Sequence, residues 1–173
     1  MRKARIAGTT VAVAAVAMAV AGYATSVADS GGAGAAAARP KPTVALRTTS
    51  LGKILVDGKT GRTLYEFGKD RRNKSNCSGS CAAIWPPLTV SGKLLAGKGV
   101  SASKLTTIKR ADGKRQAVYA GHPLYRFAAD SKAGQTNGEG VNGFGGLWYA
   151  MNARGSLVKG PPPSQPMNNP YGY

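Results

Sequence analysis

The chain has 173 residues, of which 24 are Lys or Arg and 7 are Asp or Glu, so its formal net charge is +17. Leu, Ile, Val and Phe together supply only 30 residues, enough apolar material for one small folded domain. The single histidine, His122, and the dispersed carboxylates argue against a Ser/His/Asp triad and against a zinc enzyme. We therefore predict a protein that is not an enzyme.

Residues 1–28 have the layout of a signal peptide. Three basic residues precede an uncharged apolar run over residues 6–24, and small residues fit cleavage after Ala24 or after Ala28. An uncleaved membrane anchor is the alternative, because 19 uncharged residues could just span a bilayer. Cleavage would limit membrane contact to the export step.

The cleaved protein is expected to be secreted and to stay strongly basic. Tyr23 stands where a lipoprotein would carry its lipid-bearing cysteine, so we expect no lipid anchor. Removal of residues 1–28 takes away three positive charges and no negative ones, and the net charge falls from +17 to +14. Such a charge attracts anionic polymers of the cell wall or surface without specificity, and no specific nucleic-acid partner is predicted.

Two segments that are poor in large apolar residues bound the predicted domain. Residues 29–42 are small residues ending in prolines and should form a flexible spacer, and residues 160–173 contain five prolines and should form a disordered tail. Residues 43–159 between them hold both tryptophans and most of the large aliphatic residues, so we predict one folded domain there.

This domain is predicted to be all-β. Its glycines are spaced too closely for long helices, whereas short apolar or alternating runs separated by turn residues are typical of strands. One or two short helices are expected, near residues 81–85 or 101–105. The predicted strands cover residues 54–56, 63–67, 105–110, 115–119, 124–127, 147–152 and 157–158, with turns at residues 57–61, 112–113, 121–123 and 153–155.

An internal repeat defines the predicted architecture. Residues 64–70 and 124–130 both follow the pattern L-Y-x-F-x-x-D. We predict two pseudo-symmetric repeats, about 44–90 and 104–158, each with three or four short antiparallel strands. Since neither repeat could bury much surface alone, the two should pack into one sandwich- or barrel-like domain.

Each copy of the motif predicts two buried rings and one carboxylate that orders the next loop. Tyr and Phe lie two residues apart and therefore on one face of a strand, while the Asp at the strand end can accept backbone N–H groups. A ligand role for the Asp is the alternative, although single carboxylates on separate loops do not make a calcium site. These residues are Tyr65, Phe67 and Asp70 in the first copy and Tyr125, Phe127 and Asp130 in the second.

Cys77 and Cys81 are predicted to form a disulfide. Oxidation is usual outside the cytoplasm, and three small residues allow so short a loop to close. The alternative is a copper or thiol-redox site, in which the two thiolates bind a soft metal ion with help from His122 or Met151. In the sequence Gly-His-Pro, however, His122 also fits an ordinary turn residue, and no other cofactor is predicted.

Two further features have a structural and a functional interpretation. Trp85, followed by two prolines, should pack inward on a rigid segment, with an exposed platform for sugars as the alternative. Two basic runs are either ordinary solvated charges or the contacts for polyanions. They contain Lys69, Arg71, Arg72 and Lys74 in the first run and Lys109, Arg110, Lys114 and Arg115 in the second.

Several motifs in order resemble those of the bacterial family called secreted repeat of unknown function. They are GKILVD at 52–57, TLYEF at 63–67, SNCSGSCA at 75–82, WPPL at 85–88, RADG at 110–113, GHPLY at 121–125 and WY at 148–149. The resemblance spans roughly residues 49–152. It implies an extracytoplasmic protein of paired repeats with a tandem Y-x-[FWY]-x-x-D motif and no established activity, whose relatives are predicted lipoproteins.

Together these features predict a secreted envelope protein that is a non-enzymatic binding or structural module with affinity for anionic polymers. A copper-binding or thiol-redox accessory protein is the alternative. The number of free thiols in the secreted protein separates the two classes, because a disulfide leaves none.

The signal peptide is testable by intact mass. The secreted protein should begin at Thr25 or Asp29 and carry no lipid, because the basic start, the apolar run and the small residues match signal-peptidase cleavage. A secreted species that still begins at Met1, or one with an added lipid mass, would contradict this prediction.

Overall fold

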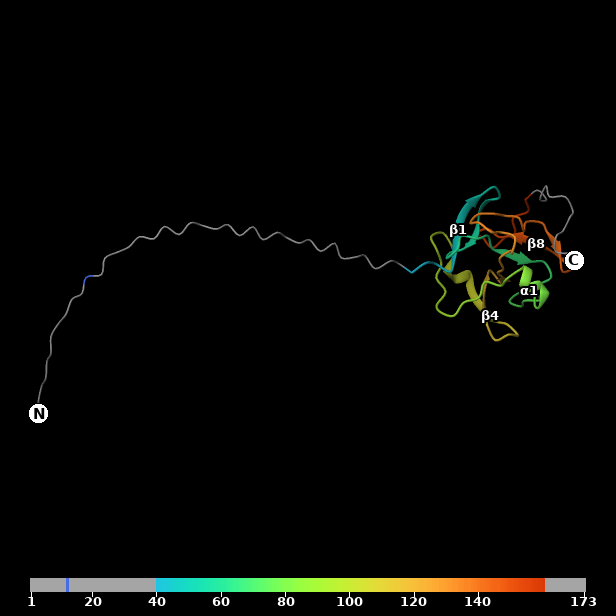
Figure 1. Ribbon diagram of the computed structural model, residues 1–173, viewed down its shortest axis with the longest axis horizontal. Coiled ribbons are helices and arrows are strands. Elements are labelled where there is room, and N and C mark those ends of the chain that lie inside the picture. The colour runs from blue at the N-terminus through green and yellow to red at the C-terminus, as the bar shows by residue number, and fades with distance from the viewer. Residues whose placement is uncertain (1–11, 13–39, 161–173) are drawn as a thin grey trace, which may run out of the picture. The chain divides into compact units, whose positions relative to one another are not determined.

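The computed structural model describes residue 12 and residues 40–160 (Figure 1). The predicted signal peptide, most of the spacer and the tail after residue 160 lie outside these described residues. No helix within them is long and apolar enough to cross a membrane. The elements are β1 (Val44–Thr49), β2 (Gly52–Asp57), β3 (Tyr65–Phe67), α1 (Ser80–Ile84), a 3-10 turn (Ala102–Lys104), β4 (Leu105–Lys109), β5 (Arg115–Tyr119), β6 (His122–Pro123), β7 (Asn142–Gly143) and β8 (Gly146–Ala150).

The strands form three small antiparallel sheets. Their orders are β1-β2, β4-β5-β6 and β3-β8-β7. The predicted Asp-Gly turn joins β4 to β5, and Gly113 has a φ of 78°, a conformation that glycine adopts without a steric penalty. The predicted all-β domain with short helices is confirmed.

One of the three sheets contains strands of both repeats. β3 of the first repeat pairs with β8 of the second, and Figure 1 shows these distant segments within one compact domain. Between the motifs, Tyr65 and Tyr125 exchange both backbone bonds, at 2.9 and 3.0 Å. The N–H of Leu64 donates to Leu55 as the N–H of Leu124 donates to Ala117, each at 3.0 Å. This matched pairing confirms the predicted two-repeat domain.

The structure adds strands that the sequence pattern did not predict. No strand was predicted at β1 or at the two-residue strand β7. The predicted turn at residues 121–123 is wrong in part, because His122 and Pro123 form the short strand β6, which pairs with β5. Residues 124–127, predicted as a strand, form isolated bridges instead. Their partner segment contains Pro86 and Pro87, which have no N–H to donate to a ladder.

The buried apolar residues form two clusters, and four stacked rings form the centre of the cluster that also contains Cys77 and Cys81. Phe67 stacks on Trp148 with centroids 4.2 Å apart, Trp148 on Trp85 at 3.9 Å, and Trp85 on Phe127 at 4.2 Å. Each phenylalanine thus packs on the tryptophan of the other repeat. Trp85 is fully buried, which confirms its inward packing and leaves no exposed face for a sugar.

The motif tyrosines close this stack at its sides. Tyr65 meets Trp85 edge-on at 5.5 Å, and Tyr125 meets Trp148 edge-on at 5.2 Å. Both tyrosines are fully buried, as the alternation predicted. The packing is tight at Gly138, where an added Cβ would lie 2.8 Å from the rings of Tyr65 and Trp85. The motif tyrosines and phenylalanines of both repeats therefore form one shared core with the two tryptophans.

Truncation of either phenylalanine should destabilise the whole domain. Phe67→Ala or Phe127→Ala should lower the free energy of unfolding by about 3–5 kcal/mol, because each ring is enclosed. Urea denaturation of the secreted protein measures this change. Leu147→Ala is the control, since this side chain is 40% exposed and its removal should cost about 0.5 kcal/mol or less. Equal effects of the three substitutions would contradict the shared core.

Candidate functional site: a basic hollow beside the disulfide

The tyrosine and the aspartate of the two motifs bond across the repeats. The Tyr65 hydroxyl donates to Asp130 Oδ2 at 2.7 Å, and the Tyr125 hydroxyl donates to Asp70 Oδ2 at 2.6 Å. These two reciprocal Tyr–Asp hydrogen bonds join the repeats, and we call them the clasp. The sequence predicts the burial of the rings but not these partners, because nothing in the pattern of one copy points to the other.

Each aspartate also orders the loop that follows it. Asp70 Oδ1 accepts the backbone N–H of Asn76 at 2.6 Å, and Asp130 Oδ1 accepts that of Asn137 at 3.0 Å. Both interactions agree with the loop-ordering role predicted for these carboxylates. The aspartates therefore bind protein groups with both oxygens.

Burial changes the acid–base properties of the clasp. It raises the pKa of Asp70 and of Asp130 from 3.8 to about 6, although the tyrosine hydroxyls act in the opposite direction. Burial also raises the pKa of Tyr65 and of Tyr125, so both hydroxyls keep their protons as donors. The charge of the two aspartates consequently changes in mildly acidic solution.

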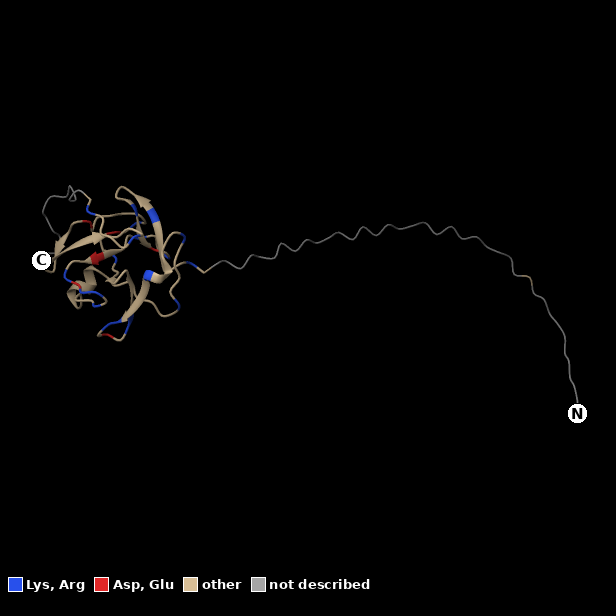
Figure 2. Cartoon of the chain, turned by 180° about the vertical axis from the view of Figure 1, so that it is seen from behind, with Lys and Arg blue, Asp and Glu red and all other residues tan. Residues whose placement is uncertain are grey.

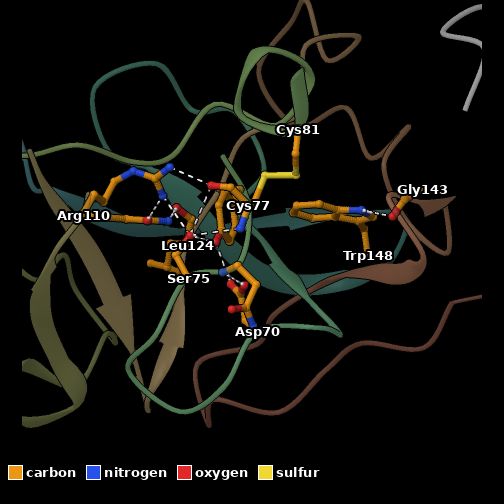
Figure 3. Close-up of a disulfide and its surroundings, with 11 residues drawn as sticks. Asp70, Ser75, Cys77, Cys81, Arg110, Leu124, Gly143 and Trp148 are labelled. Carbon is orange, nitrogen blue, oxygen red and sulfur yellow. Dashed lines mark hydrogen bonds between the residues drawn. A yellow bond between two sulfur atoms is a disulfide. The ribbon is translucent and has the colours of Figure 1, made fainter. Parts of the chain in front are cut away.

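Cys77 and Cys81 form the predicted disulfide, with Cα atoms 5.3 Å apart. Cys81 lies in α1, and both cysteines are buried against the stacked aromatic rings. In Figure 3, Cys77 lies between Arg110 and Trp148. The disulfide therefore fixes the end of the loop over residues 68–79 to the core.

The structure does not support the copper or thiol-redox alternative. His122 Nδ1 lies 3.3 Å from Glu66 Oε2. Met151 packs in the cluster of Leu64 and Tyr119, whereas the cysteines belong to the cluster of stacked rings. Among the described residues, no group of three or more His, Cys, Asp or Glu side chains could hold a metal ion. The cysteines themselves are oxidised.

Arg110 connects the two basic runs. Its Nη1 donates to Ser75 Oγ at 2.9 Å and to Gln116 Oε1 at 2.6 Å, and its Nη2 donates to the Cys77 carbonyl at 2.7 Å (Figure 3). The Arg110 side chain is only 7% exposed. Gln116 is fully buried and donates to the Leu124 carbonyl at 2.9 Å. Sequence analysis missed Gln116, whose neighbours in the sequence carry no signal for this role.

A hollow of about 440 Å³ opens between the two basic runs. Residues 73–78 of the loop form one wall, and residues 108–111 at the end of β4 form the other. Lys74, Lys109 and Arg110 line it, together with neutral side chains, and no carboxylate does. We call this site the basic hollow.

The remaining residues of the two runs lie beside the hollow in the chain but do not line it. Lys69, Arg71 and Arg72 precede its loop wall and are exposed. Lys114 and Arg115 follow its other wall and are exposed as well. The sequence identified both runs, but only the fold shows that they meet.

The carboxylates of the domain lie mostly inside it. Asp112 alone is exposed among the six acidic residues of positions 40–160. Asp57 accepts the Lys59 N–H at 2.9 Å, and Glu139 accepts the N–H groups of Ala150 and Gly160 at 2.8 and 3.1 Å. Burial raises the pKa of Glu139, a buried residue that sequence analysis did not single out.

The cations show the opposite distribution. Positions 40–160 contain 20 Lys and Arg residues, and 16 of them are exposed. Figure 2 shows them on many loops and strands of the domain. The exposed charges of the described residues are therefore almost all positive. The four Lys and Arg residues that are only partly exposed are Arg62, Lys104, Arg110 and Arg126.

The comparisons with known proteins agree with this paired architecture. The family described as a secreted repeat of unknown function matches residues 45–89 and again residues 106–152. The chain belongs to this family. It is accordingly a secreted protein built from two copies of the family's repeat. Neither the curated proteins nor the solved structures contain a match to it.

The two copies of this secreted repeat differ at the basic hollow. The loop after Asp70 reads Ser75-Asn76-Cys77, whereas the loop after Asp130 reads Thr136-Asn137-Gly138. The disulfide thus exists in one copy only, while the Tyr–Asp clasp exists in both. The duplicated residues hold the domain together, and the unique residues mark the candidate site.

The clasp predicts an unusual pH dependence of stability. Because the pKa of Asp70 and Asp130 is raised to about 6, the folded protein binds more protons than the unfolded chain between about pH 4 and pH 6. These groups contribute most below about pH 4, and the contribution is lost as the pH rises through about 6. Urea midpoints of the secreted protein should therefore fall over this window.

The double variant Asp70→Asn/Asp130→Asn is the control for this prediction. Asn keeps the shape of the side chain and one acceptor oxygen but cannot titrate, so the fall should become smaller. A smaller fall should remain, because burial also raises the pKa of Glu139. A fall of the same size in the double variant and in the original protein would contradict the role of the clasp.

Proposed function

We propose that this secreted repeat is a non-enzymatic module of the bacterial cell envelope that binds anionic polymers of the wall or surface. The observation that carries the proposal is the distribution of charge. Nearly all cations of the domain are exposed, and five of its six carboxylates are wholly or partly buried. A polyanion would therefore meet attraction on the described surface with repulsion only near Asp112.

The fold supports a binding role in a second way. Leu147 is the one large apolar side chain exposed on the described surface. Such a surface offers little for hydrophobic association with a partner, whereas released counterions can drive binding to a charged polymer. The rigid two-repeat core would display these cations in fixed positions without needing to fold on binding.

The proposal also covers localisation. Release after signal-peptide cleavage, with retention near the cell by charge instead of by lipid, fits Tyr23 in place of a lipid-bearing cysteine. The net charge of +14 after cleavage at residue 28 would supply the attraction. Extraction of the protein from intact walls by salt alone is the corresponding expectation.

Binding should be strongly sensitive to salt. The affinity of the secreted protein for a wall-type poly(glycerol phosphate) should fall at least about tenfold between 50 and 200 mM NaCl, the loss expected when about two or more counterions are released. Titration calorimetry at each salt concentration measures it, with dextran as an uncharged control polymer. Affinity unchanged in 0.5 M NaCl, or equal binding to dextran, would overturn the electrostatic proposal.

A further inference from the structure

The basic hollow differs in its charge from another hollow of the described domain. This other hollow, about 420 Å³, lies along β1, β2 and the turn after β2. It is lined by Arg47 and Lys59 but also by Asp57. The basic hollow has three cations and no carboxylate among its lining residues, although Asp112 lies beside it, 3.8 Å from Arg110 Nε. Positive charge therefore predominates around an anion placed there.

We propose that the basic hollow holds one phosphate group of the polymer, with Lys74 and Lys109 binding it from the two walls and Arg110 at its base. This inference rests on the proposed function and names the site and the chemical class of the ligand. It distinguishes one defined phosphate-binding site from the non-specific electrostatic attraction of the remaining surface.

The position of Arg110 is the first argument. Three hydrogen bonds to Ser75, Gln116 and Cys77 hold its guanidinium in place, so it needs no ordering when a ligand arrives. Its buried Nε lies 3.8 Å from the Asp112 carboxylate and is not accessible to a ligand. Of the two N–H groups on Nη2, the Cys77 carbonyl accepts one, which leaves the other for an acceptor oxygen in the hollow.

The stiffness of the loop wall is the second argument. Asn73 has a φ of 57° and its N–H donates to the Gly121 carbonyl at 2.8 Å. Arg71 and Lys74 bond to each other through both backbone groups, at 3.1 and 2.9 Å. The disulfide and the Asp70 carboxylate fix the other end of this wall. Lys74 is therefore presented from a rigid backbone.

The chemistry of the lining favours phosphate. Two ammonium groups and a guanidinium offer only donors, and a phosphate group offers only acceptors, arranged around a tetrahedral centre that can be approached from several sides. A carboxylate has two oxygens in one plane and cannot meet opposite walls as well. The volume falls within the range of small-molecule sites and leaves room for the sugar or polyol that carries the phosphate.

Two double variants with equal charge test the inference. Lys74→Gln/Lys109→Gln removes the two exposed cations of the hollow, and Lys93→Gln/Lys98→Gln removes two exposed cations outside it. The probe is a glycerol phosphate oligomer, titrated into the full secreted protein in low salt. The first variant should lose at least about tenfold in affinity and the control no more than about threefold.

The outcomes separate the inference from the proposed function. Equal losses of affinity in the two variants would overturn the proposed phosphate-binding site and leave the general electrostatic proposal intact. No binding of the oligomer by the original protein in low salt would overturn the proposed function itself. Chemical-shift changes of amides 73–78 and 108–111 on titration are expected, and their absence despite binding would also overturn the proposed phosphate-binding site.

Two further probes test the ligand class. Polyglutamate of matched charge should bind more weakly than the oligomer and lose affinity equally in both variants, and a selective loss in Lys74→Gln/Lys109→Gln would overturn the preference for phosphate. Vesicles containing phosphatidylglycerol present phosphate on a lipid. Tighter binding to these vesicles than to the oligomer would overturn the assignment to a polymer.

Discussion

The structure depends on reciprocal hydrogen bonds and ring contacts between the two repeats. Tyr65 and Tyr125 pair through their backbones, and each hydroxyl donates to the aspartate of the other copy. Beside them, Trp85 and Trp148 stack on each other and each covers the phenylalanine of the other copy. A short motif therefore stabilises the domain only when it is present twice, because each copy supplies the partners that the other needs.

This arrangement explains how so basic a chain can fold and why nearly all the exposed charges of its described residues are positive. The clasp and the loop contacts use the carboxylates as hydrogen-bond acceptors inside the domain, where Asp57, Asp130 and Glu139 are buried. Few remain to neutralise the exposed lysines and arginines. These cations are spread around the domain, which limits their mutual repulsion in salt because exposed charges are screened. The internal architecture and the external charge thus have a common origin.

The sequence predicts those features that depend on local pattern or on the duplication itself. The alternation within L-Y-x-F-x-x-D predicts the buried rings, the Asp-Gly turn predicts the β4–β5 hairpin, and compartment predicts the disulfide. β1 was missed because its apolar residues end at Leu46 and because Ser50-Leu51, which lead to β2, lack the Asp-Gly signal of the β4–β5 turn. The pairing of β3 with β8 and the meeting of Lys74 with Lys109 depend on contacts between distant segments, for which a single sequence has no periodic signal.

The pairing of β3 with β8 has a consequence for how a secreted chain folds. β3 pairs with a strand about 80 residues later, so the sheet cannot close until nearly the whole domain is available. A chain that is still emerging would hold its first copy without the rings and the strand that complete it. Formation of this sheet therefore requires the chain up to at least Ala150. A product that ends before β8 would lack the partner of β3 and the ring of Trp148, and it would remain open to proteolysis.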